Sequence, residues 1–167
     1  MTAEVSHFER LGLPAAPDVD LAVAERNYLR LSRALHPDFQ APGDEAAADR
    51  ANDATARLNE AWAVISDPEA RAEYLLELRD PGAMERSKTL SPAFLAEAME
   101  LSEEAEAAAR EPAAAAKLRA RVQADADARL ASVLSPAAWA SPDTRRLATA
   151  LHELRVLRRV LRDLGAA

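Results

Sequence analysis

Three consecutive residues, His36-Pro37-Asp38, carry the side chains of this sequence that are best suited to specific recognition. Pro37 disfavours helical geometry at His36, so the sequence predicts that the preceding helix stops near Leu35. No plausible nucleophile–base pair and no set of metal ligands stands beside the tripeptide. We therefore interpret it as a recognition surface displayed at a helix end, rather than as a catalytic centre.

The helix that leads into this tripeptide has two different faces. Its apolar stripe consists of Ala24, Tyr28, Leu31 and Leu35. Arg26, Arg30 and Arg33 recur at i, i+4 and i+7, nearly opposite that stripe. An arginine-rich face is often only a solvated surface, so the arginines alone leave solubility and binding equally open. Beside the tripeptide, we favour contact with a partner.

The composition excludes several classes of protein. The 167 residues contain no cysteine, which rules out disulfides, zinc ribbons and cysteine-ligated iron–sulfur clusters. The histidines His7, His36 and His152 have no metal-ligand spacing, and we expect no metal or cofactor. The net charge of −7 argues against a nucleic-acid binder. Without a membrane-length apolar run or a signal pattern, we expect a soluble cytoplasmic protein with no membrane partner.

Prolines that follow capping residues mark several expected helix starts, because the missing N–H of proline would be unbonded there anyway. Such pairs are Asp67-Pro68, Ser91-Pro92, Ser135-Pro136, Ser141-Pro142 and, more weakly, Glu111-Pro112. With the apolar periodicity they predict an all-α protein with helices at about 6–12, 18–35, 43–66, 68–79, 92–110, 113–133 and 142–164.

The segment 80–90 lacks helical periodicity and is interpreted as a linker. It separates a first domain, residues 1–79, from a second domain, residues 91–167. We expect the second and third helices of the first domain to form an antiparallel hairpin, flanked by short helices. The second domain is expected to be a three-helix bundle.

The first helix after the linker carries two large apolar residues away from its core stripe. That stripe consists of Phe94, Ala98, Leu101, Ala105 and Ala108. Leu95 and Met99 lie off it, beside Glu100 and Glu103. Large apolar residues rimmed by carboxylates are typical of a partner-binding patch. Single exposed apolar residues are also common, so the spacing alone leaves partner binding and a surface or wider-core role equally open.

Residues 6–79 resemble a J domain in the order of their motifs. A short helix with Phe8-Glu9-Arg10-Leu11-Gly12-Leu13 precedes the basic helix. The long helix after the His-Pro-Asp loop ends in Leu58-Asn59-Glu60-Ala61-Trp62, followed by Asp67-Pro68-Glu69-Ala70-Arg71-Ala72-Glu73-Tyr74. The resemblance implies binding to a DnaK/HscA-type chaperone ATPase, with His36, Pro37 and Asp38 as the essential loop. Arg26, Arg30 and Arg33 would then supply the electrostatic contact.

The second domain is similar to the scaffold-binding part of the HscB family. Ser91-Pro92-Ala93-Phe94-Leu95-Ala96-Glu97-Ala98-Met99-Glu100-Leu101 looks like the acidic helix that binds the scaffold in that family. The resemblance implies scaffold contacts at Leu95, Ala96, Met99, Glu100, Glu103, Ala107 and Val156. Val156 is expected to point away from the core stripe of the last helix, which is Leu147, Leu151, Leu154, Leu157 and Leu161.

Taken together, the resemblance implies a co-chaperone of the HscB family that is not an enzyme. Such a protein binds an IscU-type iron–sulfur scaffold, delivers it to the chaperone ATPase, stimulates ATP hydrolysis and so assists maturation of iron–sulfur proteins. Two alternatives remain open: a J-domain co-chaperone with a different client, and a helical adaptor that does not stimulate the ATPase.

Overall fold

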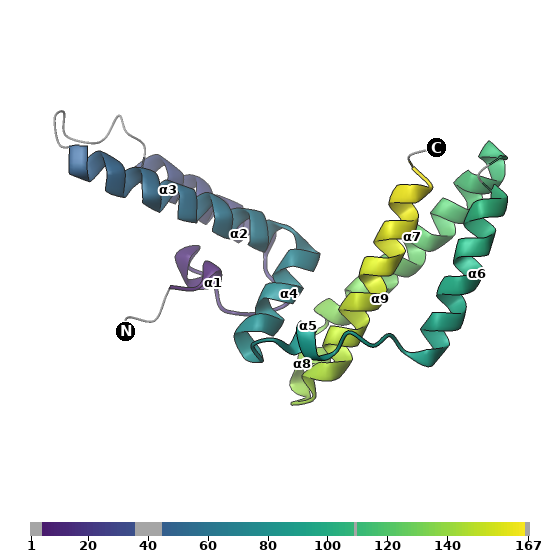
Figure 1. The fold of residues 1–167 in the computed structure, drawn as a ribbon. Coiled ribbons are helices and arrows are strands. Elements are labelled where there is room, and N and C mark those ends of the chain that lie inside the picture. Colours follow the sequence, from purple (N-terminus) through teal and green to yellow (C-terminus); the bar gives the residue numbers. More distant parts are fainter. Residues whose placement is uncertain (1–4, 36–44, 109, 166–167) are drawn as a thin grey trace. The chain divides into compact units, whose positions relative to one another are not determined.

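The computed structural model describes residues 5–35, 45–108 and 110–165, and these residues are helical with no strand among them (Figure 1). The predicted all-α fold is therefore confirmed. The helices are α1 (His7–Arg10), α2 (Leu21–Leu35), α3 (Glu45–Ser66), α4 (Pro68–Arg79), α5 (Ala83–Arg86), α6 (Pro92–Ala108), α7 (Pro112–Leu134), α8 (Pro136–Ala140) and α9 (Thr144–Asp163). Within the described ranges, no helix is long and apolar enough to cross a membrane.

The contacts divide the chain into two units, Met1–Tyr74 and Leu75–Ala167. The division falls inside α4, whereas the helix pattern of the sequence predicts that the first domain ends at residue 79. The expected linker 80–90 contains a short helix, α5, which follows Gly82 in a left-handed conformation with φ of 76°. A helix of four residues makes little more than one turn. It therefore leaves no apolar periodicity by which the sequence could reveal it.

Two of the proline-led helix starts are fixed by the expected caps. The Asp67 carboxylate accepts a hydrogen bond from the Ala70 amide at 2.7 Å, where α4 begins at Pro68. The Ser91 hydroxyl accepts one from the Phe94 amide at 3.3 Å, where α6 begins. Such caps satisfy amide groups that have no partner within the helix.

Other predicted bounds are wrong because a nearby aspartate caps the helix instead. The α2 helix begins at Leu21 rather than at 18, since Asp20 accepts hydrogen bonds from the amides of Ala22 and Val23. The α9 helix begins at Thr144 rather than at Pro142, since Asp143 accepts one from the Arg145 amide. The Ser135-Pro136 pair does start a helix, the short α8.

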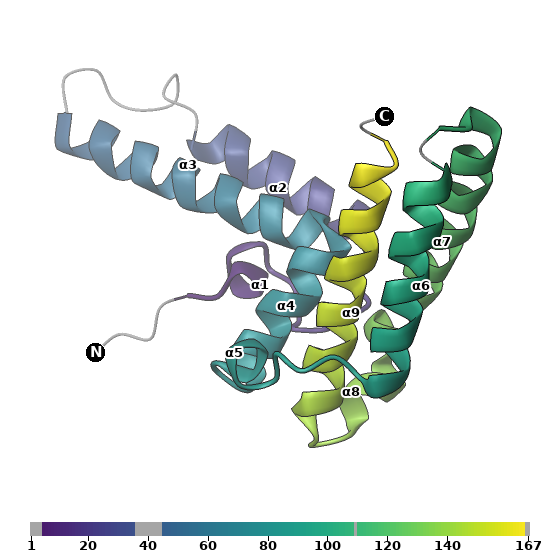
Figure 2. The same cartoon turned by 45° about the vertical axis from the view of Figure 1, so that its right-hand side comes forward.

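In the N-terminal unit, α2 and α3 lie side by side as the predicted antiparallel hairpin (Figures 1 and 2). The Tyr28 ring stacks on Trp62 with centroids 5.0 Å apart, and its hydroxyl donates to the Asn59 side chain at 3.0 Å. Phe8 of α1 is fully buried, as is Ile65 of α3. These contacts fix the position of α2, and with it the exposed basic face of α2, relative to α3.

The end of the sequence stretch that resembles a J domain, Arg71 to Tyr74, acts as an anchor in the N-terminal unit. Arg71 is only 4% exposed, and its guanidinium donates to the carbonyls of Pro17 and Ile65 at 3.1 and 2.6 Å. Burial lowers the pKa of Arg71. The Tyr74 hydroxyl accepts a hydrogen bond from the His7 amide at 3.0 Å. Together these bonds tie α4 to α1, to the end of α3 and to the segment before α2.

The predicted three-helix bundle of the C-terminal unit is formed by α6, α7 and α9, with α8 between the last two. Large side chains from α7 and α9 supply most of the core, whereas α6 contributes Phe94 and Leu101 as its large buried residues. The indole N–H of Trp139 on α8 donates to the Val133 carbonyl at 2.7 Å. Arg79 donates to the carbonyls of Trp139 and Ser141, which joins the end of α4 to α8.

Candidate partner-binding sites

One face of α6 is exposed and carries the two large apolar residues singled out by the sequence. Leu95 is 47% exposed and Met99 is 68% exposed, while Phe94 beside them is buried. Ala96, Glu100, Glu103 and Ala107 are exposed as well. We call the residues Leu95, Ala96, Met99, Glu100, Glu103 and Ala107 the α6 patch. The prediction that Leu95 and Met99 lie off the core stripe is confirmed, and their role in binding stays a prediction.

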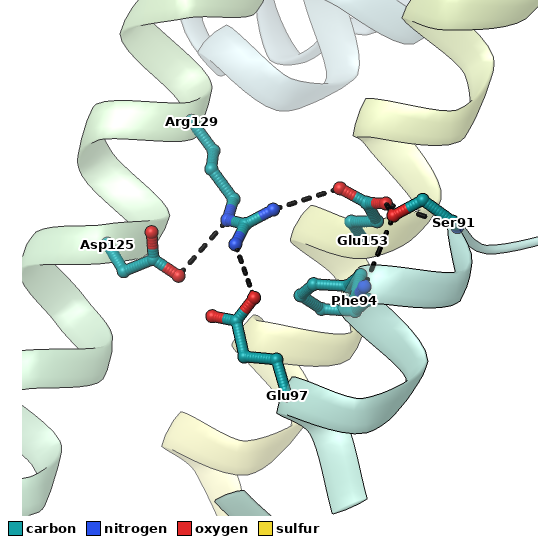
Figure 3. A network of polar contacts seen from close by, with 6 residues as sticks. All are labelled: Ser91, Phe94, Glu97, Asp125, Arg129 and Glu153. Carbon is teal, nitrogen blue, oxygen red and sulfur yellow. Dashed lines mark hydrogen bonds and ion pairs between the residues drawn. The ribbon is translucent and has the colours of Figure 1, made fainter.

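Arg129 of α7 holds α6 in place through the side of α6 that carries Phe94 and Glu97 (Figure 3). Its guanidinium donates to Glu97 of α6 at 2.8 Å, to Glu153 of α9 at 2.9 Å and to Asp125 at 3.0 Å. It also lies 4.8 Å from the centroid of the Phe94 ring. One cation therefore connects all three long helices of the bundle, and sequence spacing gave no sign of it.

Glu153 carries this connection on to the first turn of α6. The side chain is buried, and it accepts hydrogen bonds from the Ser91 hydroxyl at 2.5 Å and from the Ser91 amide at 3.3 Å. The same hydroxyl caps α6 through Phe94, as Figure 3 shows. Burial tends to lower the Arg129 pKa, but the hydrogen bond and charge of Asp125, with those of Glu97, raise it. Arg129 therefore remains charged, and α6 begins at a defined place beside α9.

Replacing Arg129 with methionine is expected to lower the free energy of unfolding by about 2–3 kcal/mol, because Glu153 then loses its partner inside the bundle. Chemical denaturation of the full chain measures the loss. The matched control is Arg121→Met, since Arg121 pairs with Glu104 while both side chains are about half exposed. An exposed pair contributes at most about 1 kcal/mol. Equal losses for the two variants would contradict the anchoring role of Arg129.

The five carboxylates of α6 fall into two groups. Glu97 and Glu104 are bound by Arg129 and Arg121 of α7. Glu100, Glu103 and Glu106 are exposed, and none of them takes part in an ion pair with the part of the chain that is described. The carboxylates of Glu97 and Glu104 position α6 against α7. The remaining three carboxylates of α6 are available to a partner.

Val156 is not directed to solvent, contrary to the expectation from its position off the leucine stripe of α9. It is half-buried and packs against the core of the C-terminal unit. The expectation took the core stripe of α9 to be narrow, but α9 contacts both α7 and α6, so a broader strip of it is covered. The contact of Val156 with a scaffold stays a prediction, now for a residue at the edge of the core.

The basic face of α2 forms a second exposed surface. Arg26, Arg30 and Arg33 are all exposed, and Ala24 on the other side of the helix is buried. Leu29 is 46% exposed and lies three residues after Arg26 and four before Arg33, so it shares their face. Sequence reasoning missed Leu29, although its spacing off the apolar stripe was the signal. The loop residues His36, Pro37 and Asp38 lie outside the described residues.

Two protein-family models match the chain over separate residue ranges. Residues 6–74 match the DnaJ domain, and residues 90–164 match the HSCB C-terminal oligomerisation domain. The co-chaperone protein HscB homologue of Bordetella parapertussis is 33% identical over 162 residues, which cover 96% of this chain and 95% of that protein. The chain belongs to the co-chaperone HscB family. Membership rests on nearly the full length of both proteins.

Other HscB proteins share the sequence or the fold. The co-chaperone protein HscB homologue of Burkholderia multivorans is 35% identical over 96% of this chain and 93% of its own. The structure of the chaperone HscB from Vibrio cholerae has a TM-score of 0.79 at 27% identity and covers 96% of both chains. The human co-chaperone protein HscB shows the same fold, with a TM-score of 0.82 at 22% identity over 99% of this chain and 83% of its own.

The histidine, aspartate and glutamate side chains are possible metal ligands. Within residues 5–35, 45–108 and 110–165, no three of them come together as a group that could hold a metal ion. The two exposed surfaces, the α6 patch and the basic face of α2, therefore hold the side chains from which a function is inferred.

Proposed function

We propose that this HscB-family chain is a cytoplasmic, non-enzymatic co-chaperone that binds an IscU-type iron–sulfur scaffold protein and delivers it to a DnaK/HscA-type chaperone ATPase. It stimulates ATP hydrolysis by that partner and so assists maturation of iron–sulfur proteins. The observation that carries the proposal is the exposure of Leu95 and Met99 on an α6 whose core side is firmly anchored. The sequence of this helix resembles the scaffold-binding helix of the HscB family.

The N-terminal unit supplies the ATPase-binding end. Arg26, Arg30 and Arg33 form an exposed positive face on α2, which favours an acidic surface on the ATPase. Leu29 adds an apolar contact within that face. The His36-Pro37-Asp38 loop, which follows α2 in the sequence, is the element that the J-domain resemblance makes essential for stimulation.

The C-terminal unit supplies the scaffold-binding end. Leu95 and Met99 give the α6 patch an apolar centre, and Glu100 and Glu103 give it a negative rim. Apolar anchors inside a polar rim are typical of protein interfaces. We include Val156 as a contact at the margin, and Ala96 and Ala107 as positions where a scaffold backbone can approach closely.

A chain with two binding ends raises the local concentration of one partner near the other. Once the chain has bound both partners, the scaffold meets the ATPase within one complex. The effective concentration of the scaffold is then set by the segment that joins the two units of the chain. The scaffold is thereby presented at the moment when the J domain triggers hydrolysis. This arrangement explains why recognition surfaces, rather than catalytic groups, dominate both units.

The experiment that tests the proposal measures ATP turnover by a purified DnaK/HscA-type chaperone in four mixtures: alone, with this chain, with an IscU-type scaffold, and with both. We expect stimulation by the chain and a larger effect when both are present. Stimulation that never depends on the scaffold would favour a different client. No stimulation by the chain, with scaffold binding retained, would favour the adaptor alternative.

Changing Arg26, Arg30 and Arg33 to glutamate is expected to weaken binding of the ATPase by at least about tenfold at low salt, because three attractive charges become repulsive. The difference from wild type should shrink as ionic strength rises, since exposed charges are screened over about 8 Å at physiological salt. Surface plasmon resonance over a salt series measures both effects.

The matched control for this variant is the change of Arg119, Arg145 and Arg159 to glutamate in the C-terminal unit. These arginines are exposed too, and the net charge changes by the same amount. The control should bind the ATPase like wild type in the absence of scaffold. If both variants bind the ATPase equally weakly, the loss comes from the net charge and not from the position of the arginines on α2.

A further inference from the structure

A groove runs between α6 and α9 toward the end of the chain, next to the α6 patch. It is lined by Ser102, Ala105, Glu106, Ala115, Val160, Asp163 and Leu164, and it has a volume of about 350 Å³. The floor is apolar, because the side chains that meet there are alanine, valine and leucine. In Figure 2, α6 and α9 lie side by side along this stretch. Small residues on the facing helices leave the space open.

The groove continues the α6 patch. Glu106 follows Met99 by seven residues, which places the two on one face of α6. Val160 follows Val156 by four residues and therefore lies one turn further along the same side of α9. A partner segment that covers Leu95, Met99 and Val156 and proceeds toward the end of α9 enters the groove directly.

The rim of the groove is negative on both sides. Glu106 stands on the α6 side and Asp163 on the α9 side, both exposed. No ion pair with another described residue neutralises either carboxylate. An apolar floor between two unpaired carboxylates suits a partner segment in which an apolar side chain is followed by lysine or arginine. A segment with acidic residues would be repelled from the same position.

We propose that this groove, together with Glu106 and Asp163, is a specificity site that binds a short basic-apolar segment of the scaffold, beyond the α6 patch. The proposal rests on the proposed scaffold binding. The apolar side chain of the segment packs on Ala105, Val160 and Leu164, and its cation reaches the two carboxylates. The α6 patch supplies most of the affinity, while the groove decides which scaffold, and in which direction, is bound.

The test compares two groove variants with wild type for binding to an IscU-type scaffold. The first, Glu106→Gln with Asp163→Asn, removes the charges but keeps the shapes. We expect roughly tenfold slower association at low ionic strength and a weaker salt dependence. The second, Val160→Phe, fills the groove and should weaken affinity by at least about tenfold. Stopped-flow and calorimetric titration give these quantities, and thermal unfolding shows that each variant is folded.

A control with the same change of charge is Glu60→Gln with Asp53→Asn on α3, where both residues are exposed. It should associate with the scaffold at the wild-type rate. If wild type binds the scaffold and Leu95→Ala with Met99→Ala does not, the proposed function stands on its own. Wild-type binding by both charge and shape variants of the groove would then overturn the specificity site alone. If wild type does not bind the scaffold, both proposals fall.

A second copy of this chain is the other occupant that the charges allow, because α9 carries exposed arginines. Sedimentation velocity over a range of concentrations distinguishes it from the scaffold. Self-association that is lost in the same two groove variants would assign the groove to a second copy and overturn the proposal. A concentration-independent monomer, with scaffold binding weakened as described, supports it.

Discussion

Replacing His36 with glutamine is expected to abolish stimulation of ATP hydrolysis by the DnaK/HscA-type partner without unfolding the chain. The α2 helix extends to Leu35, and Pro37 in the sequence keeps His36 out of a continuing helix. His36 also falls outside the apolar stripes of both hairpin helices. Its substitution therefore removes a recognition group and leaves the hairpin core, which is built around Tyr28, Trp62 and Ile65.

ATP turnover by the partner, measured with wild type and with the His36→Gln variant, gives the expected loss directly. Circular dichroism and thermal unfolding should be unchanged. The variant carries its own control, because scaffold binding uses the C-terminal unit and should keep its wild-type affinity. Full stimulation by the variant would show that the His-Pro-Asp loop is not what activates the ATPase in this chain.

Truncation of Leu95 and Met99 to alanine is expected to weaken scaffold binding by about a hundredfold or more while hardly changing stability. Removing a central anchor of an interface costs about 2 kcal/mol or more, and each 1.4 kcal/mol is about a factor of ten in affinity. Surface truncations stay within about 0.5 kcal/mol each, whereas buried ones cost about 2–5 kcal/mol. The exposure of both side chains predicts the first case.

Calorimetric titration with an IscU-type scaffold and a denaturation curve on the same variant measure both quantities. The matched control is Leu21→Ala with Leu78→Ala, since these leucines are 43% and 45% exposed and belong to α2 and α4 rather than to α6. ATPase stimulation by the double variant alone should survive, and the extra stimulation by the scaffold should vanish. Adding Glu100→Ala should lower the affinity for the scaffold further, mostly through slower association. Normal binding in the Leu95 and Met99 variant would leave a co-chaperone with another client.

Local signals in the sequence predicted the helices well where a cap and a proline act together. Asp67 and Ser91 each bond an amide three residues on, and such bonds depend only on neighbours in the sequence. The same rule failed at Ser141-Pro142, because Asp143 stands closer to the helix and caps it instead. The four residues of α5 were missed because one turn shows no period.

Long-range contacts were beyond the reach of the sequence. Nothing in the spacing of Arg71 or Arg129 distinguishes them from the many solvated arginines of this chain, yet the first is buried and the second joins three helices. Val156 was misplaced for a related reason, since it packs against a core cluster that residues of α6, α7 and α9 form together. The position of Leu95 and Met99 off the core stripe could be predicted, because neither residue is three or four positions from Phe94 or Leu101.

The core-facing side chains near the C-terminal end of α6 are small, which affects the hydrogen exchange of this helix. Its core stripe ends in Leu101, the half-buried Ala105 and Ala108, while α9 buries five leucines over its length. Small side chains bury little apolar area, so the free energy that opposes local opening is lowest in the last turns of α6. Amides of residues 102–108 should exchange with deuterium before those of α7 and α9. A scaffold bound to this helix should slow the exchange of these amides. Their protection therefore reports formation of the complex.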